Sequence, residues 1–125
     1  MQRIPTLVGA SGHFLGEAFP LKYGAPLVVG RSRSADISLK RTEKYRTQSP
    51  EERDKDEMAQ TVSSKHFQIT MHNLQSIEVK NLSPNGTLLD GQRIETAVIQ
   101  DVATRSHEIR FGLVDALKLE MRSYE

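Results

Sequence analysis

The 125-residue chain has no cysteine, no long apolar run and no excess of charge of either sign. The lack of cysteine excludes a disulfide framework and any thiolate metal site, and it is typical of a cytoplasmic protein. No apolar run approaches the roughly 20 residues of a membrane-spanning helix, and residues 1–5 lead directly into strand-like sequence, so we expect neither a membrane segment nor a signal peptide. The 17 basic and 16 acidic residues nearly cancel, to a net charge of +1. We therefore expect no general attraction to nucleic acid or membranes, and any anion site must be local.

The residues that are present give the composition of a folded globular protein. The chain is 37% apolar and 26% charged, which matches neither a disordered tail nor a membrane protein. A chain of this length is about the size of one domain and can bury a core without disulfides. We therefore expect one domain that spans residues 1–125.

Short apolar runs recur along the chain, and several of them alternate with polar residues. Phe67, Ile69 and Met71 alternate in this way, and period 2 with one apolar face is typical of half-buried antiparallel strands. An Asp-Gly pair at 90–91 between two apolar runs predicts a two-residue hairpin. The predicted strands are at residues 6–8, 18–21, 26–29, 36–39, 66–71, 76–80, 88–89, 93–94, 108–111 and 116–121. So many short strands indicate an all-β sandwich or barrel.

Residues 40–60 break this pattern, because they are densely charged and show no apolar period. Ser49 is placed to cap a helix, with Pro50 at its first position and Glu52 completing a capping box. Only Met58 and Ala59 offer an apolar face. We expect either a short solvated helix within a long loop or a mobile loop.

Three short motifs at strand ends or in turns carry the chemistry that holds a phosphate group on a peptide. They are Gly-Arg at 30–31, Ser-Ser-Lys-His at 63–66 and Asn-Gly-Thr at 85–87. The guanidinium of Arg31 is a planar fork of donors that stays charged and suits bidentate contact with phosphate. The hydroxyls of Ser63 and Ser64 are further donors, and the carboxamide of Asn85 can both donate to and accept from a peptide backbone.

Each motif also has an ordinary structural interpretation. Arg31 can pair with Asp36 or lie free on the surface, the serines can make local turn hydrogen bonds, and Asn85 can simply fit a tight turn. A histidine at a strand start, His66, is better explained as a buried hydrogen-bonding strut than as a metal ligand or catalytic base. The other histidines show no ligand spacing with it, and no carboxylate is placed to form a triad.

The order of these motifs and their surroundings resembles the forkhead-associated (FHA) domain family. The resemblance is carried by residues 29–39, 62–69 and 79–91, and residues 108–112 look like that family's later strand ending in Phe-Gly. It implies an antiparallel β-sandwich of about eleven strands whose loops at one end bind phosphothreonine peptides, with residues 40–60 as a charged insertion.

The resemblance also implies roles for single residues. Arg31 would contact the phosphate or the peptide beside it, Ser63 would donate to the phosphate with Ser64 next to it, and Asn85 would bind the peptide main chain. Lys65 and Arg33 would lie at the rim and add positive charge. The structural positions would be Gly30 for close packing, His66 to brace the loops and Gly86 for turn geometry.

Three features depart from the family pattern. Pro84 stands where many members carry a threonine, so one side-chain donor and one backbone donor are lost. Ser64 is shorter than the arginine or asparagine often found there. The insertion at 40–60 lies at the edge of the expected site, where its basic half can extend recognition and its acidic half can compete for Arg31.

We therefore expect a non-catalytic module that binds a phosphothreonine-containing protein, such as a Ser/Thr kinase or its substrate. The alternative is a module with the same fold that binds partners independently of phosphorylation. An enzyme is disfavoured, because the sequence shows no activated nucleophile, metal cluster, Walker loop or paired acid–base group. We expect no metal, no cofactor and no nucleic-acid partner.

Overall fold

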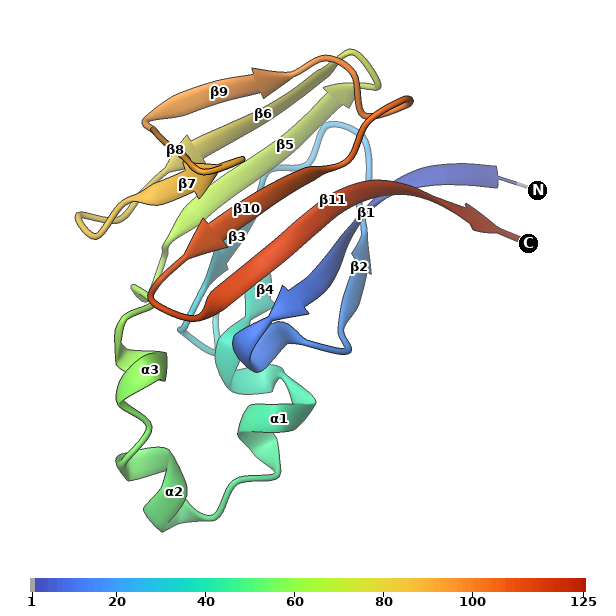
Figure 1. Ribbon diagram of the computed structural model, residues 1–125. Coiled ribbons are helices and arrows are strands. Elements are labelled where there is room, and N and C mark those ends of the chain that lie inside the picture. Colours follow the sequence, from blue (N-terminus) through green and yellow to red (C-terminus); the bar gives the residue numbers. More distant parts are fainter. Residues whose placement is uncertain (1) are drawn as a thin grey trace.

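The computed structural model describes residues 2–125, which form eleven strands and a few short helices (Figure 1). The strands are β1 Gln2–Ser11, β2 Ala18–Pro20, β3 Leu27–Gly30, β4 Ile37–Ser38, β5 Phe67–Asn73, β6 Ser76–Asn81, β7 Thr87–Leu89, β8 Gln92–Ile94, β9 Thr96–Ile99, β10 His107–Phe111 and β11 Asp115–Tyr124. The helices are the 3-10 turns η1 Gly12–Phe14 and η2 Leu39–Arg41 and the α-helices α1 Glu43–Arg46, α2 Pro50–Asp54 and α3 Glu57–Gln60. None of these helices is long and apolar enough to cross a membrane.

The strands form two sheets that pack into a β-sandwich, which confirms the predicted fold class. One sheet has the order β2-β1-β11-β10-β7-β8 and the other β4-β3-β5-β6-β9. All strand pairs are antiparallel except β3 with β4, which run parallel, so the antiparallel expectation fails at that one edge. The alternating residues of the sequence face the space between the sheets, where Phe111 packs against Phe14 and Phe67 with ring centroids 5.5 and 5.2 Å apart.

The register of the strands decides which loops meet. Val29 at the end of β3 pairs with Phe67 at the start of β5, and Phe67 pairs with Asn81 at the end of β6. In the other sheet, Thr87 at the start of β7 pairs with Phe111 at the end of β10. The loops after β3, before β5 and between β6 and β7 therefore gather at one end of the sandwich.

The hairpin between β7 and β8 has the predicted two-residue loop. Asp90 and Gly91 both lie in the left-handed region, with φ of 50° and 85°. This conformation is what a type I′ turn requires, and it matches the twist of the two flanking strands. The loop therefore follows directly from the Asp-Gly pair.

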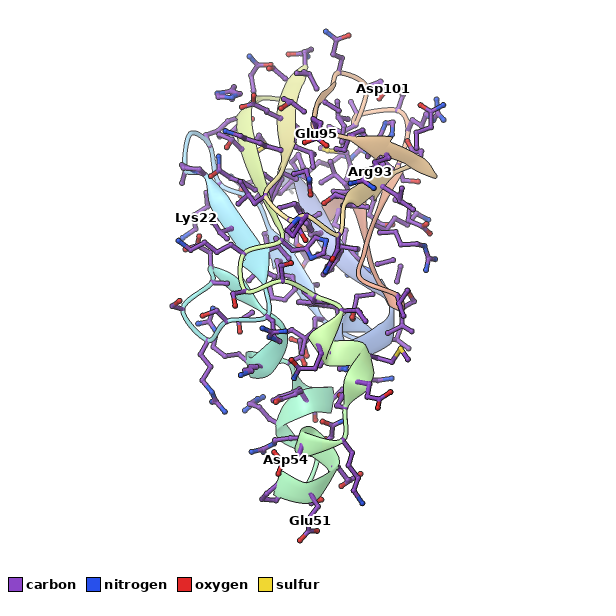
Figure 2. The ribbon with its side chains drawn as sticks, turned by 90° about the vertical axis from the view of Figure 1, so that its left-hand side faces the viewer. Lys22, Glu51, Asp54, Arg93, Glu95 and Asp101 are labelled. Carbon is purple, nitrogen blue, oxygen red and sulfur yellow. The ribbon has the colours of Figure 1, made fainter. Side chains whose placement is uncertain are left out.

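The insertion forms three short helices rather than one, and it is only partly solvated. The predicted capping box is present, since Ser49 and Glu52 bond reciprocally at the start of α2, and α2 has no buried residue. Figure 1 shows α2 as the part farthest from the sheets, and in Figure 2 the side chains of Glu51 and Asp54 point away at its tip. In contrast, Tyr45 of α1 and Ala59 of α3 are 7% and 1% exposed and belong to the core. The expected short solvated helix is confirmed by α2, but the expected long loop around it is wrong, because α1 and α3 flank α2 and each buries a residue against the sandwich.

Candidate functional site

Backbone hydrogen bonds join the first two motifs, at the end of the sandwich where the helices lie. The N–H of Arg31 donates to the carbonyl of Ser63 at 2.9 Å, and the N–H of Ser32 donates to that of Ser64 at 3.3 Å. Gly30 is needed for this approach, because a Cβ at that position would lie 2.1 Å from the Ser64 carbonyl oxygen. Any side chain at residue 30 would therefore push the loops after β3 and before β5 apart.

The Arg31 side chain is held by the insertion and not by an acidic partner. Its Nη1 donates to the side-chain Oε1 of Gln60 at 3.1 Å and to the Gln60 carbonyl at 3.4 Å. Asp36, the acidic residue that the sequence offered as a partner, instead accepts from the N–H of Val28 at 2.8 Å. Within the described residues, the side-chain contacts of Arg31 all fall on Nη1, which leaves the Nε and Nη2 donors of the fork for an anion.

Ser63 lies in a short chain of hydroxyl and amide contacts. Its Oγ is 2.6 Å from the Oγ of Ser83, which also accepts from the N–H of Asn85 at 3.0 Å. Asn81 fixes Ser83 in turn, since its side chain accepts from the Ser83 N–H and donates to the Ser83 carbonyl. When Ser83 donates to Ser63, the Ser63 proton is free to point at an anion. The pair therefore lets Ser63 act as a donor without losing its internal partner.

Asn85 lies exposed in a tight turn that Pro84 favours. The N–H of Gly86 donates to the Ser83 carbonyl at 3.1 Å, which places Pro84 at the second position of the turn, where its fixed φ is suited. The Asn85 Nδ2 donates to the carbonyl of Thr61 at 3.3 Å, and this contact leaves the carboxamide oxygen uncommitted. Pro84 thus removes a donor but keeps the turn that presents Asn85.

His66 ties two of the motifs together from beneath and is fully buried. Its Nδ1 accepts from the N–H of Ser63 at 3.0 Å, and its Nε2 contacts the carbonyl of Gly86 at 2.8 Å. These partners require the neutral tautomer with the proton on Nε2, and burial lowers the pKa of His66, which favours the same neutral form. The imidazole therefore sets the distance between the Ser63 loop and the Asn85 turn.

The other residues expected at the site lie on the surface. Ser64, Lys65 and Arg33 are exposed, and their side chains make no hydrogen bond or ion pair within residues 2–125. Sequence reasoning missed Gln60 and Ser83. No motif in the charged segment singles out Gln60. Ser83 directly precedes the Pro-Asn-Gly run, and this position could have identified it from the sequence.

Comparison with known proteins shows which family the fold belongs to. A family model described as FHA domain matches residues 27–112. The chain belongs to the FHA domain family. A search of curated protein sequences finds no match.

Solved FHA domains share the fold across nearly the whole chain. The FHA domain of the CT664 protein from Chlamydia trachomatis has a TM-score of 0.65 and 22% identity, with 99% of this chain and 100% of that chain covered. An FHA domain of an Arabidopsis thaliana hypothetical protein has a TM-score of 0.69 and 21% identity over 99% and 90%. The N-terminal FHA domain of S. cerevisiae Rad53p, solved in complex with a phosphothreonine peptide, has a TM-score of 0.62 and 17% identity over 95% and 94%. At these identities the likeness concerns the fold.

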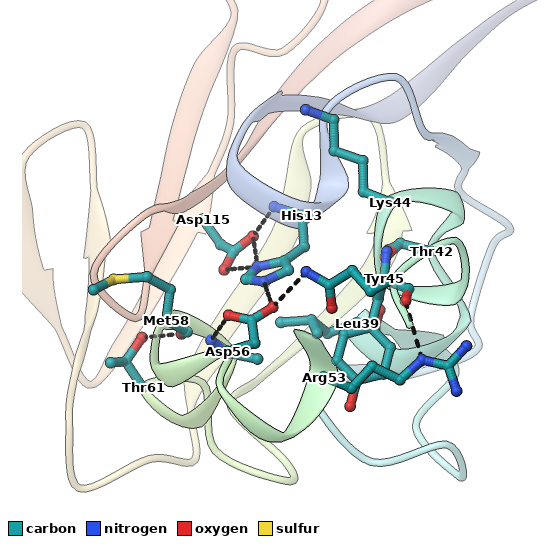
Figure 3. Close-up of polar contacts among 12 residues, drawn as sticks. His13, Leu39, Thr42, Lys44, Tyr45, Arg53, Asp56, Met58, Thr61 and Asp115 are labelled. Carbon is teal, nitrogen blue, oxygen red and sulfur yellow. Dashed lines mark hydrogen bonds and ion pairs between the residues drawn. The ribbon is translucent and has the colours of Figure 1, made fainter. Parts of the chain in front are cut away.

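A second polar cluster of this FHA domain joins the insertion to the sandwich (Figure 3). His13 lies between two carboxylates: its Nδ1 is 3.0 Å from Asp115 at the start of β11, and its Nε2 is 2.8 Å from Asp56 at the start of α3. The hydrogen bond to Asp115 raises the pKa of His13, with a further contribution from Asp56, and together they outweigh the opposing effect of burial. His13 therefore favours the charged form and bridges two anionic groups.

His107 has the same arrangement at the hairpin. It contacts Asp90 through Nδ1 and Asp101 through Nε2, at 2.7 Å for the second pair. Burial alone would lower the pKa of His107, but the two aspartates outweigh it and the pKa is raised. The FHA domain thus holds two buried histidines that favour the charged form and one, His66, that favours the neutral form.

These three histidines predict a maximum of stability near pH 6.5, their ordinary pKa. His13 and His107, whose pKa is raised in the folded state, stabilise the fold fully below pH 6.5. This contribution to the free energy of unfolding is lost as the pH rises through their folded-state pKa. The lowered pKa of His66 acts oppositely, because the unfolded chain binds more protons below pH 6.5 and stability falls there. Urea unfolding from pH 5 to 9 checks this curve. His13→Gln should flatten its alkaline side, whereas the exposed control His72→Gln should not; a flat wild-type curve would contradict the assignment.

Proposed function

We propose that this FHA domain binds a phosphorylated threonine of a partner protein through Arg31, Ser63 and Asn85. FHA domains are non-catalytic binding modules that typically bind phosphothreonine peptides. The observation that supports the proposal for this chain is that three loops gathered at one end of the sandwich carry a guanidinium, a hydroxyl and a carboxamide. Within residues 2–125, Arg31 and Asn85 keep side-chain polar atoms without a hydrogen-bond partner, and Ser63 keeps a free hydroxyl proton when Ser83 donates to it.

The chemistry of these groups fits a phosphate on a peptide. A phosphothreonine adds roughly −1.5 to −2 charge and three acceptor oxygens, so a charged fork and a hydroxyl distinguish it from an unmodified threonine. The open Nε and Nη2 donors of Arg31 suit bidentate contact with two of these oxygens. The free carboxamide oxygen of Asn85 can accept a hydrogen bond from a main-chain N–H of the peptide, which adds affinity that does not depend on the phosphate.

The remaining polar residues of the site have smaller proposed roles. Ser64 would add a second hydroxyl beside Ser63, and the exposed Lys65 and Arg33 would add a diffuse positive field at the rim. The partner would be a protein phosphorylated on threonine, such as a Ser/Thr kinase or its substrate. Titration with a phosphothreonine peptide library and its unphosphorylated twin tests the proposal. Equal binding of the two would reject it in favour of phosphorylation-independent recognition.

Ser63→Ala is expected to weaken binding of a phosphothreonine peptide selected from that library by about 10-fold. A hydrogen bond from a hydroxyl to a charged group contributes about 1.5–3 kcal/mol, and about 1.4 kcal/mol corresponds to 10-fold in affinity. Isothermal titration calorimetry measures the change. Ser123→Ala, an exposed serine in β11, is the matched control and should bind as the wild type does. Unchanged affinity of Ser63→Ala would exclude Ser63 as a phosphate donor.

A further inference from the structure

The end of the insertion contacts two of the three side chains proposed to bind the phosphopeptide. Gln60, the last residue of α3, holds Arg31, and Thr61, the next residue, accepts from Asn85. The Thr61 hydroxyl also accepts from the N–H of Leu113 in the turn between β10 and β11, at 3.0 Å. We call residues 42–61 the helical arm. Its C-terminal end is thus bonded to three loops at the same end of the sandwich.

The start of the same helix is fixed to the sandwich by charge and by burial. One oxygen of Asp56 caps α3 by accepting from the N–H of Ala59 at 3.0 Å, and the other contacts His13 at 2.8 Å and Gln48 at 3.1 Å (Figure 3). His13 is in turn held by Asp115, which is fully buried. Ala59 packs into the core. Only one helical turn separates Asp56 from Gln60, so a displacement of Asp56 is passed directly to the residues that hold Arg31 and Asn85.

We propose that the helical arm is a positioning element of the phosphopeptide site, in which Gln60 and Thr61 orient Arg31 and Asn85 and the Asp56–His13 pair holds the arm in place. This inference rests on the proposed function of Arg31 and Asn85. A free arginine samples many rotamers, and restricting it before the ligand arrives moves that entropic cost from binding to folding. If the arm detaches, the binding-competent fraction falls and the apparent affinity falls with it.

The residue type at position 60 supports a positioning role. The arm is rich in carboxylates, yet the side chain that reaches Arg31 is the neutral amide of Gln60. A neutral acceptor restrains the guanidinium without cancelling its charge or repelling a phosphate. A carboxylate at this place would restrain Arg31 as well but would compete with the ligand.

The first test needs no ligand and uses NMR of the whole chain. In Asp56→Asn and in Gln60→Ala, we expect the side-chain signals of Arg31 Nε–H to shift and broaden, and in Asp56→Asn those of the Asn85 carboxamide as well. Asp54→Asn removes the same charge from the end of α2 and should leave both unchanged. Gln60→Ala alters an exposed residue, so it tests the contact even if Asp56→Asn folds poorly. Unchanged Arg31 signals in Gln60→Ala would overturn the proposal.

The second test measures affinity for a phosphothreonine peptide selected from the library. We expect Asp56→Asn and Gln60→Ala to bind about 3- to 10-fold more weakly than the wild type, the range of one ordinary hydrogen bond, and Asp54→Asn to bind equally well. Gln60→Glu should keep the Arg31 signals ordered and still bind more weakly. If the wild type binds no phosphopeptide, the proposed function fails. If it binds and the variants with disturbed signals bind equally tightly, the positioning role alone is overturned.

Discussion

Replacing Arg31 with alanine is expected to weaken phosphothreonine-peptide binding by about 100-fold and to leave the free energy of unfolding nearly unchanged. Two charge-assisted hydrogen bonds from the guanidinium to phosphate contribute about 1.5–3 kcal/mol each. Taking the lower figure for both bonds gives about 3 kcal/mol. Because about 1.4 kcal/mol corresponds to a 10-fold change in affinity, this loss weakens binding by about 100-fold. In the free protein, the hydrogen bonds of the same side chain within residues 2–125 all go to Gln60, at the surface. Such exposed contacts contribute little to stability, so the loss should appear in binding alone.

Two further substitutions separate the fork of Arg31 from its charge. Arg31→Lys keeps the positive charge but loses the bidentate geometry, so it should bind with intermediate affinity. Arg33→Ala removes an exposed arginine two residues away and should change the affinity only about 2-fold at low salt, as expected for a screened rim charge. Calorimetric titration with the phosphorylated and unphosphorylated peptides measures all three variants. Equal losses for Arg31→Ala and Arg33→Ala would show a diffuse electrostatic effect instead of a specific phosphate contact.

The parts of the fold that depend on local pattern could be predicted from the sequence. Alternation in β5 and β10 reveals their buried faces, and the Asp-Gly pair determines the hairpin loop, because both signals lie within a few residues. Strand β9 was missed, since its residues 96–99 place apolar side chains on both faces and Val98 is 51% exposed at the edge of the sheet. Edge strands bury one face incompletely, and their sequence signal is correspondingly weak.

In the insertion, too, features set by neighbouring residues could be predicted, whereas contacts with residues distant in sequence could not. Its capping box at Ser49 was predictable, because a cap needs only residues three positions apart. The burial of Tyr45 was not, because its partners come from distant parts of the chain: His13 follows β1, with ring centroids 6.5 Å apart. An isolated aromatic residue in a charged segment gives no period from which docking can be inferred. For the same reason the contacts of Gln60 with the site become visible only in three dimensions.

Replacing His66 with alanine is expected to destabilise the fold by about 4 kcal/mol. The imidazole is fully buried, and truncation of a buried ring costs about 3–5 kcal/mol through lost contacts and the cavity left behind. The Ser63 N–H and the Gly86 carbonyl also lose their partner, and an unsatisfied buried group costs about 1–3 kcal/mol. Partial collapse of the site and entry of water reduce the sum. The expected loss is a large share of the roughly 5–15 kcal/mol that a folded protein has in total.

Urea unfolding at pH 7 measures this loss, and two observations identify its cause. Ser63→Ala keeps the N–H that donates to His66, so it should destabilise by only about 1 kcal/mol. In His66→Ala the amide of Ser63 should exchange its hydrogen much faster than in the wild type, because its acceptor is gone. The acidic side of the pH–stability curve should also flatten, since His66 is the group whose lowered pKa produces it. A loss of stability with the acidic side unchanged would mean that the ring acts only by filling space. With both changes, His66 is the polar brace between the Ser63 loop and the Asn85 turn.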